Sequence, residues 1–103
     1  MANYLLTFYD GGMPETQEDH AAVMQAWTAW FAELGDALVD GGNPTARSRA
    51  ISPDGSVMEA TSAPSGYSII KAEDLDAAVA AAKGCPVLAG GATLVVSETF
   101  PAM

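Results

Sequence analysis

The sequence has little cysteine: Cys85 is the single one among 103 residues, so the chain has no means of forming an internal disulfide. A reactive thiolate requires a lowered pKa, and neither neighbour of Cys85, Gly84 or Pro86, is basic. We therefore expect Cys85 to pack as a small hydrophobic residue and not to act as a nucleophile.

Positive charge is also scarce, since four Lys and Arg stand against thirteen Asp and Glu and give a formal charge of -9. Such a chain repels phosphate backbones and anionic lipid surfaces, so we expect neither a nucleic-acid nor a membrane partner. No apolar run approaches the roughly 20 residues that span a bilayer. The first ten residues, MANYLLTFYD, lack the pattern of a secretion signal. We expect an acidic, cytoplasmic protein.

What the sequence does contain is a large apolar fraction. Half of the residues are hydrophobic and 17% are charged, which excludes a disordered chain. The length predicts a single domain over residues 1–103 with one small core, which a partner subunit would stabilise further.

The clearest pattern runs from residue 66 to residue 96. The segment GYSIIKA at 66–72 is apolar on both sides of its pleat, which indicates a central strand. The acids in 73–76 suit the first turn of a helix, and the glycine at 84 suits its end. The predicted core stripe of this helix is Leu75, Ala78, Val79 and Ala82. A last strand is expected over 93–100.

The N-terminal part repeats this order. Residues 3–9 are apolar in both alternating sets and predict a strand that is covered on both faces. A helix is expected to begin near Thr16, which caps it with Asp19 in the first turn, and to end at Gly35. Its predicted apolar face consists of Val23, Met24, Trp27, Trp30, Phe31 and Leu34, and we expect it to lie on the sheet.

The middle of the chain is rich in turn residues. Residues 37–43 predict an irregular or short extended link. The segments 45–51 and 56–61 flank Pro53-Asp54-Gly55, a turn sequence, and predict a hairpin.

Together these elements predict an α+β, ferredoxin-like βαββαβ fold with a four-stranded antiparallel sheet and two helices on one face. Several strands are apolar on both sides, so the sheet face without helices must be covered by something. We expect a homodimer.

The order of these segments resembles the YCII-related family over nearly the whole chain. The resemblance rests on YLLTFY at 4–9, the helix with Trp27 and Gly35, the GYSII strand, and the stretch from Leu75-Asp76 through KGCP at 83–86 to Gly90-Gly91. It implies ferredoxin-like domains that pair as dimeric α/β barrels. It also implies acid/base chemistry on a small aromatic or lactone-like acid, with no cofactor.

The sequence departs from the family pattern in two places. The larger branch of the family has Asp-Gly-Pro-Phe before the Gly-Tyr strand, where this chain has TSAPS at 61–65. Some members carry a His on the first helix about eleven residues before its glycine, and that spacing reaches Met24, whereas His20 lies one turn earlier.

His20 is the candidate general base, because its unperturbed pKa lies near neutrality. Asp36 and Asp40 are the candidate carboxylates that orient it. The alternative is a solvated histidine among the acids of the first helical turn. No metal site is expected, and Gly90-Gly91 lacks the lysine and helix of a phosphate-binding loop.

Substrate binding has its own candidates. Arg47 and Arg49 share a strand face by their spacing and would hold a carboxylate, unless they pair with the chain's own acids. Tyr9, Trp27 and Tyr67 would line an apolar pocket, unless they are core residues. Two function classes therefore remain: an acid/base enzyme, and a non-catalytic ligand-binding or regulatory module that acts through a homodimer surface.

Overall fold

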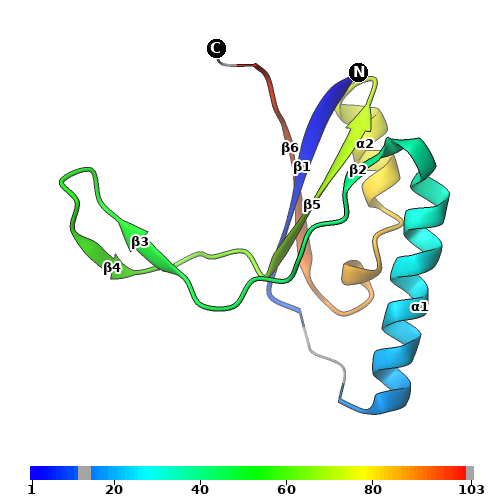
Figure 1. Ribbon diagram of the computed structural model, residues 1–103, viewed down its shortest axis with the longest axis horizontal. Helices are drawn as coiled ribbons and strands as arrows, with labels where there is room; N and C mark the ends of the chain where they lie inside the picture. Colours follow the sequence, from blue (N-terminus) through cyan, green and yellow to red (C-terminus); the bar gives the residue numbers. More distant parts are fainter. Residues whose placement is uncertain (12–14, 102–103) are drawn as a thin grey trace.

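A computed structural model describes residues 1–11 and 15–101 (Figure 1). Its strands are β1 (Ala2–Tyr9), β2 (Leu38–Asp40), β3 (Arg49–Ile51), β4 (Val57–Glu59), β5 (Gly66–Ala72) and β6 (Thr93–Glu98). Its helices are α1 (Gln17–Leu34) and α2 (Leu75–Ala82), with short 3-10 turns η1 (Gly35–Ala37) and η2 (Pro86–Leu88). Within the described ranges no helix is long and apolar enough to cross a membrane.

Four strands form one antiparallel sheet in the order β2-β5-β1-β6. Both helices lie on one side of this sheet (Figure 1). The predicted α+β class is confirmed, and the arrangement is consistent with a ferredoxin-like fold. The two central strands are β1 and β5, the segments whose sequences are apolar on both sides.

The core lies between the sheet and the helices. The alternation of β1 and β5 directs one set of side chains toward the helices, where the set is buried. The main buried residues are Tyr4, Leu6, Phe8, Trp30, Ile70, Ala78, Ala82 and Cys85. The opposite side of the sheet, which we call the outer face, carries the half-buried remainder: Leu5, Thr7, Tyr9, Tyr67 and Ile69.

Helix α1 begins as predicted. The Thr16 hydroxyl accepts a 3.0 Å hydrogen bond from the Asp19 amide, and the helix ends at Gly35, whose φ is +53°. The prediction that the whole apolar face lies on the sheet is wrong for the first half. Residues 17–26 are all exposed, including Val23 and Met24, because this part of the helix extends past the end of the sheet (Figure 1).

Helix α2 approaches the sheet through its smallest residues. The Asp74 carboxylate caps it by accepting a 2.8 Å hydrogen bond from the Ala77 amide. Ala78 and Ala82 are buried, as predicted. Leu75 and Val79, predicted to be core residues, are instead 43% and 37% exposed, and Val79 lines a hollow beside β6.

The predicted hairpin is present but its strands are shorter than expected, with three residues each. The turn is the predicted one: the Gly55 amide donates to the Ser52 carbonyl at 2.8 Å, and Gly55 has a φ of +92°. The sheet β3-β4 is separate from the four-stranded sheet. Residues 45–65, which we call the arm, extend away from the body on the side opposite the helices (Figure 1).

Candidate functional site

The structure places the three predicted catalytic residues at two ends of α1. His20 is exposed in the first turn, whereas Asp36 lies in η1, directly after the helix. Sixteen residues of nearly continuous helix separate the two by about 24 Å. Asp40 lies at the same end as Asp36, and its Oδ1 accepts a 2.8 Å hydrogen bond from the Gly42 amide. One subunit therefore does not bring His20 together with Asp36 or Asp40, the two predicted orienting carboxylates.

The three predicted pocket aromatics lie on two faces of the sheet. Trp27 packs on the helix side, with ring centroids 5.8 Å from Phe8, 5.6 Å from Trp30 and 5.5 Å from Phe31. Tyr9 and Tyr67 belong to the outer face. Because the sheet lies between them, these three side chains do not line one pocket. Trp27 is a core residue, the second of the two interpretations open from the sequence.

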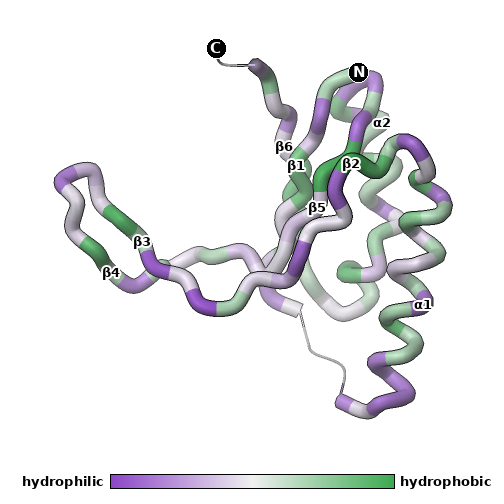
Figure 2. Tube along the Cα trace, viewed as in Figure 1, coloured by the Kyte–Doolittle hydropathy of each residue, from purple (hydrophilic) through white to green (hydrophobic). Residues whose placement is uncertain are grey.

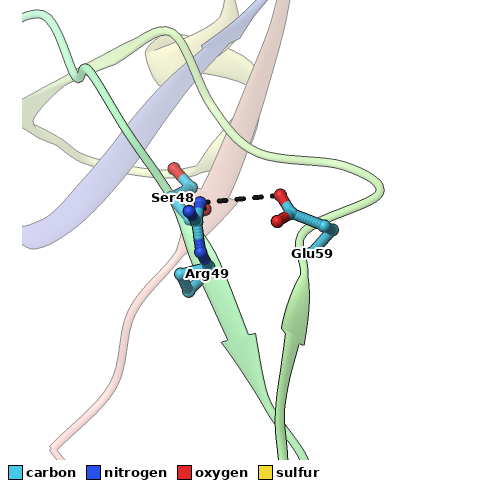
Figure 3. Close-up of polar contacts among 3 residues, drawn as sticks. All are labelled: Ser48, Arg49 and Glu59. Carbon is cyan, nitrogen blue, oxygen red and sulfur yellow. Dashed lines mark hydrogen bonds and ion pairs between the residues drawn. The ribbon is translucent and has the colours of Figure 1, made fainter.

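The two arginines lie in the arm. Arg49 is opposite Glu59 across the hairpin, and its Nη1 lies 3.5 Å from the Glu59 Oε2 and 2.9 Å from the Ser48 carbonyl (Figure 3). Arg47 precedes β3 and is exposed. Arg49 therefore pairs with an acid of its own chain, and the two arginines do not share a strand as predicted.

A polar cavity of about 450 Å³ lies where the arm meets the sheet. It is lined by Tyr9, Asp10, Thr61, Ser62, Ala63 and Thr93. Tyr9 and Thr93 are cross-strand partners on the outer face. Asp10 directly follows β1, and the other lining residues belong to the segment of the arm that follows β4. We call this space the rim cavity.

Hydrogen bonds at the root of the arm hold the rim cavity in shape. The Ser65 amide and hydroxyl both donate to the Phe8 carbonyl, at 2.6 and 3.1 Å. The Thr45 hydroxyl, at the start of the arm, donates to the Pro64 carbonyl, at its end. Asp10 has a φ of +63°, a conformation that is uncommon outside glycine and that is often found at functional sites.

The lining of the rim cavity supports binding more than catalysis. It offers three hydroxyls of Thr and Ser, one phenol and one carboxylate, and no basic side chain. Its volume falls within the range of small-molecule sites. Of its residues only Tyr9 was predicted from the sequence as a site residue, because the others come together through tertiary contacts between segments about fifty residues apart.

A second hollow, of about 110 Å³, lies between α2, η2 and β6. It is lined by Val79, Ala82, Lys83, Leu88, Leu94 and Val96. This volume is below that of ordinary ligand sites. Among the described residues no group of three or more His, Cys, Asp and Glu side chains is placed to hold a metal ion.

Cys85 is buried, and burial raises the pKa of its thiol to about 11. We expect iodoacetamide to label it at pH 8 about 100-fold more slowly in the native protein than in guanidinium chloride, because the thiolate is the reactive form. Mass spectrometry of the intact chain over time measures both rates. Similar rates in the two conditions would show that the thiol is accessible and ionised.

Comparison with protein-family models and with curated proteins gives no match for this chain. The resemblance to the YCII-related family therefore stays a prediction that rests on the residues quoted above.

Proposed function

We propose that this protein is a homodimeric, non-catalytic binding module that holds a small polar ligand in the rim cavity. Two subunits pair through their outer sheet faces, in the manner of a dimeric α/β barrel. One observation carries this proposal: the rim cavity opens at the border of an apolar sheet face on which no described helix lies (Figure 1).

The outer face has the composition of a buried surface. Leu5 lies beside Ile69, and Thr7 lies between Tyr67 and Val95. In a chain of net charge -9, no Asp or Glu occupies an outer-face position of β1, β5 or β6. The charged residues on this side are Lys71 and, on the edge strand β2, Asp40, which is paired with Ile69. Carboxylates are therefore confined to one edge of the face, which supports pairing of identical copies through its centre.

The rim cavity lies next to this interface. Thr7–Val95 and Tyr9–Thr93 are successive pairs on the outer face, and the second pair lines the cavity. A partner that packs on this face therefore approaches the mouth of the cavity. Ligand sites are frequently found at such borders between subunits or domains. Binding and pairing would then support each other.

The chemistry of the cavity selects among ligands. Hydroxyl-bearing molecules match the Thr, Ser and Tyr groups, and the Asp10 carboxylate favours a cation and disfavours an acid. The acid/base enzyme on an aromatic or lactone-like acid gains no comparable support, since His20 is exposed and lines neither of the two cavities described.

The proposal is tested by two measurements on the whole chain. Light scattering at micromolar concentration is expected to give the mass of a dimer. Thermal unfolding with three sugars of equal size is expected to show stabilisation by glucosamine and glucose and none by glucuronate, because only the last is an anion.

The control for this experiment is Asp10→Asn, which keeps a side chain that tolerates positive φ but removes the charge. We expect it to lower the affinity for glucosamine about tenfold and to leave glucose binding unchanged, because a hydrogen bond to a charged group contributes about 1.5 to 3 kcal/mol. A monomeric mass would refute the pairing. Equal shifts for all three sugars, or none, would refute the ligand site.

A further inference from the structure

The arm is the least supported part of the molecule. Its regular structure is limited to β3 and β4, which have three residues each and form a separate two-stranded sheet. A hairpin of two strands with nothing packed on it is only marginally stable in water. Its turn is well formed, since the Ser56 amide and hydroxyl donate to the Asp54 carboxylate at 2.9 and 2.6 Å and lower the pKa of that group.

The arm nevertheless carries apolar side chains into solvent. Ile51 and Val57 are cross-strand partners and are 72% and 65% exposed, and Met58 is 49% exposed. Figure 2 shows these two strands as hydrophobic segments far from the body. An exposed apolar pair on a projecting hairpin is typical of a contact surface.

The surface area of the chain is larger than that of a compact monomer of the same mass. The accessible surface is 7255 Å², whereas a folded chain of this size exposes about 5,500 Å². The radius of gyration is 15.1 Å, compared with about 13 Å for a compact domain of this length. The excess of about 1,800 Å² is twice what one partner contributes to a standard interface. The exposed apolar side chains of the arm are part of this excess.

Charge indicates what covers the arm. Arg47, Arg49, Asp54 and Glu59 make the arm neutral, so the rest of the chain carries the whole charge of -9. The arm also holds both arginines of the chain. A neutral surface with exposed apolar side chains meets the acidic body of a second copy without repulsion between like charges, whereas two bodies would repel each other.

We infer that the arm packs against the body of the second subunit, and that the two arms of the dimer are exchanged reciprocally. The inference rests on the proposed pairing through the outer faces. The arm extends on the side of that face, and its nine residues from the root to the tip reach about 30 Å. Paired sheets lie about 10 Å apart, so the arm passes alongside the partner's sheet and continues beyond it.

Hydrogen exchange of the wild-type protein tests this contact directly. The backbone amides of β3 and β4 are expected to exchange at least tenfold more slowly in the dimer than in the same protein diluted below its dissociation constant. Mass spectrometry of peptides from the arm measures the rates. Equal rates in dimer and monomer would overturn the arm contact while leaving the outer-face dimer in place.

The double variant Ile51→Thr with Val57→Thr tests the apolar pair. Threonine keeps the β-branched shape, so the hairpin is retained. Two apolar side chains in each subunit, four in the dimer, become polar and lose their contribution to the interface. We expect the dimer dissociation constant to rise at least tenfold. The matched control is Val23→Thr with Met24→Thr, an exposed apolar pair on α1, which should leave it unchanged.

The outcomes separate the two proposals. A monomeric wild-type protein refutes the proposed function, and the arm inference fails with it. A dimer whose dissociation constant is the same in the arm variant and the control refutes the arm inference alone.

Discussion

Replacing Gly42 with Ala is expected to destabilise the fold more than any other change of a single methyl group described here. A Cβ atom at this position would lie 1.7 Å from the Tyr67 carbonyl oxygen, and the residue has a φ of +73°. Side chains do not relieve this clash, because the obstacle is the backbone of β5. The strand β2 must move away, which also breaks the 2.8 Å hydrogen bond from the Ser68 hydroxyl to the Gly41 carbonyl.

We expect Gly42→Ala to lower the free energy of unfolding by about 3 kcal/mol or more, from backbone strain together with overpacking. That is a large part of the 5 to 15 kcal/mol typical of a domain. Urea unfolding at fixed protein concentration measures the loss.

The matched control is Gly91→Ala. Gly91 has a φ of +89°, but an added Cβ meets nothing within 4 Å. This variant should lose only about 1 to 2 kcal/mol, the cost of a left-handed backbone at a residue with a side chain. Equal losses in the two variants would contradict the clash at β5.

Val95→Asp is expected to separate the proposed dimer into monomers. Val95 lies on the outer face of β6, opposite Thr7, and is 42% exposed in the single chain. In the pair of sheets its replacement would bury two uncompensated carboxylates, one from each copy. Truncated or unpaired charges in interfaces cost about 2 to 5 kcal/mol, so we expect the dissociation constant to rise at least 100-fold.

Sedimentation equilibrium over a range of concentrations measures this change. The control is Val23→Asp, the same substitution at a valine that is 38% exposed on α1 and lies away from the outer face. It should leave the dimer intact, and circular dichroism should show both variants folded. A dimer unaffected by Val95→Asp would show that the subunits pair elsewhere or not at all.

The elements of this fold were predictable because each depends on interactions within a few residues. Thr16 caps α1 through the Asp19 amide, Gly35 ends that helix, and Pro53-Asp54-Gly55 turns the hairpin. The two-sided apolar pattern of residues 66–72 likewise identified β5 as a central strand. These signals are contained in the local sequence, so they needed no knowledge of the rest of the molecule.

The candidate site was predicted less well. The helical periodicity of α1 continues to Val23 and Met24 but says nothing of where the sheet ends, so it did not reveal that residues 17–26 lie beyond it. The helix predicted between Thr16 and Gly35 already separates His20 from Asp36 by about 24 Å, so the sequence itself argues against this pair within one subunit. The rim cavity had no sequence signal beyond Tyr9, because its walls come from three separate segments.

By itself the sequence determined the charge of -9 and the type and order of the main elements. It also showed that no basic residue adjoins Cys85, so that nothing next to it lowers the pKa of its thiol. Only the tertiary structure decided that the arm leaves the sheet on the side of the outer face, and that Trp27 and Tyr67 are separated by the sheet. The physical reason is the range of the interactions: caps, turns and periodicity act over three or four residues. The positions of the arm and the cavity depend instead on contacts such as Ser65 to Phe8, between residues 57 apart in the chain.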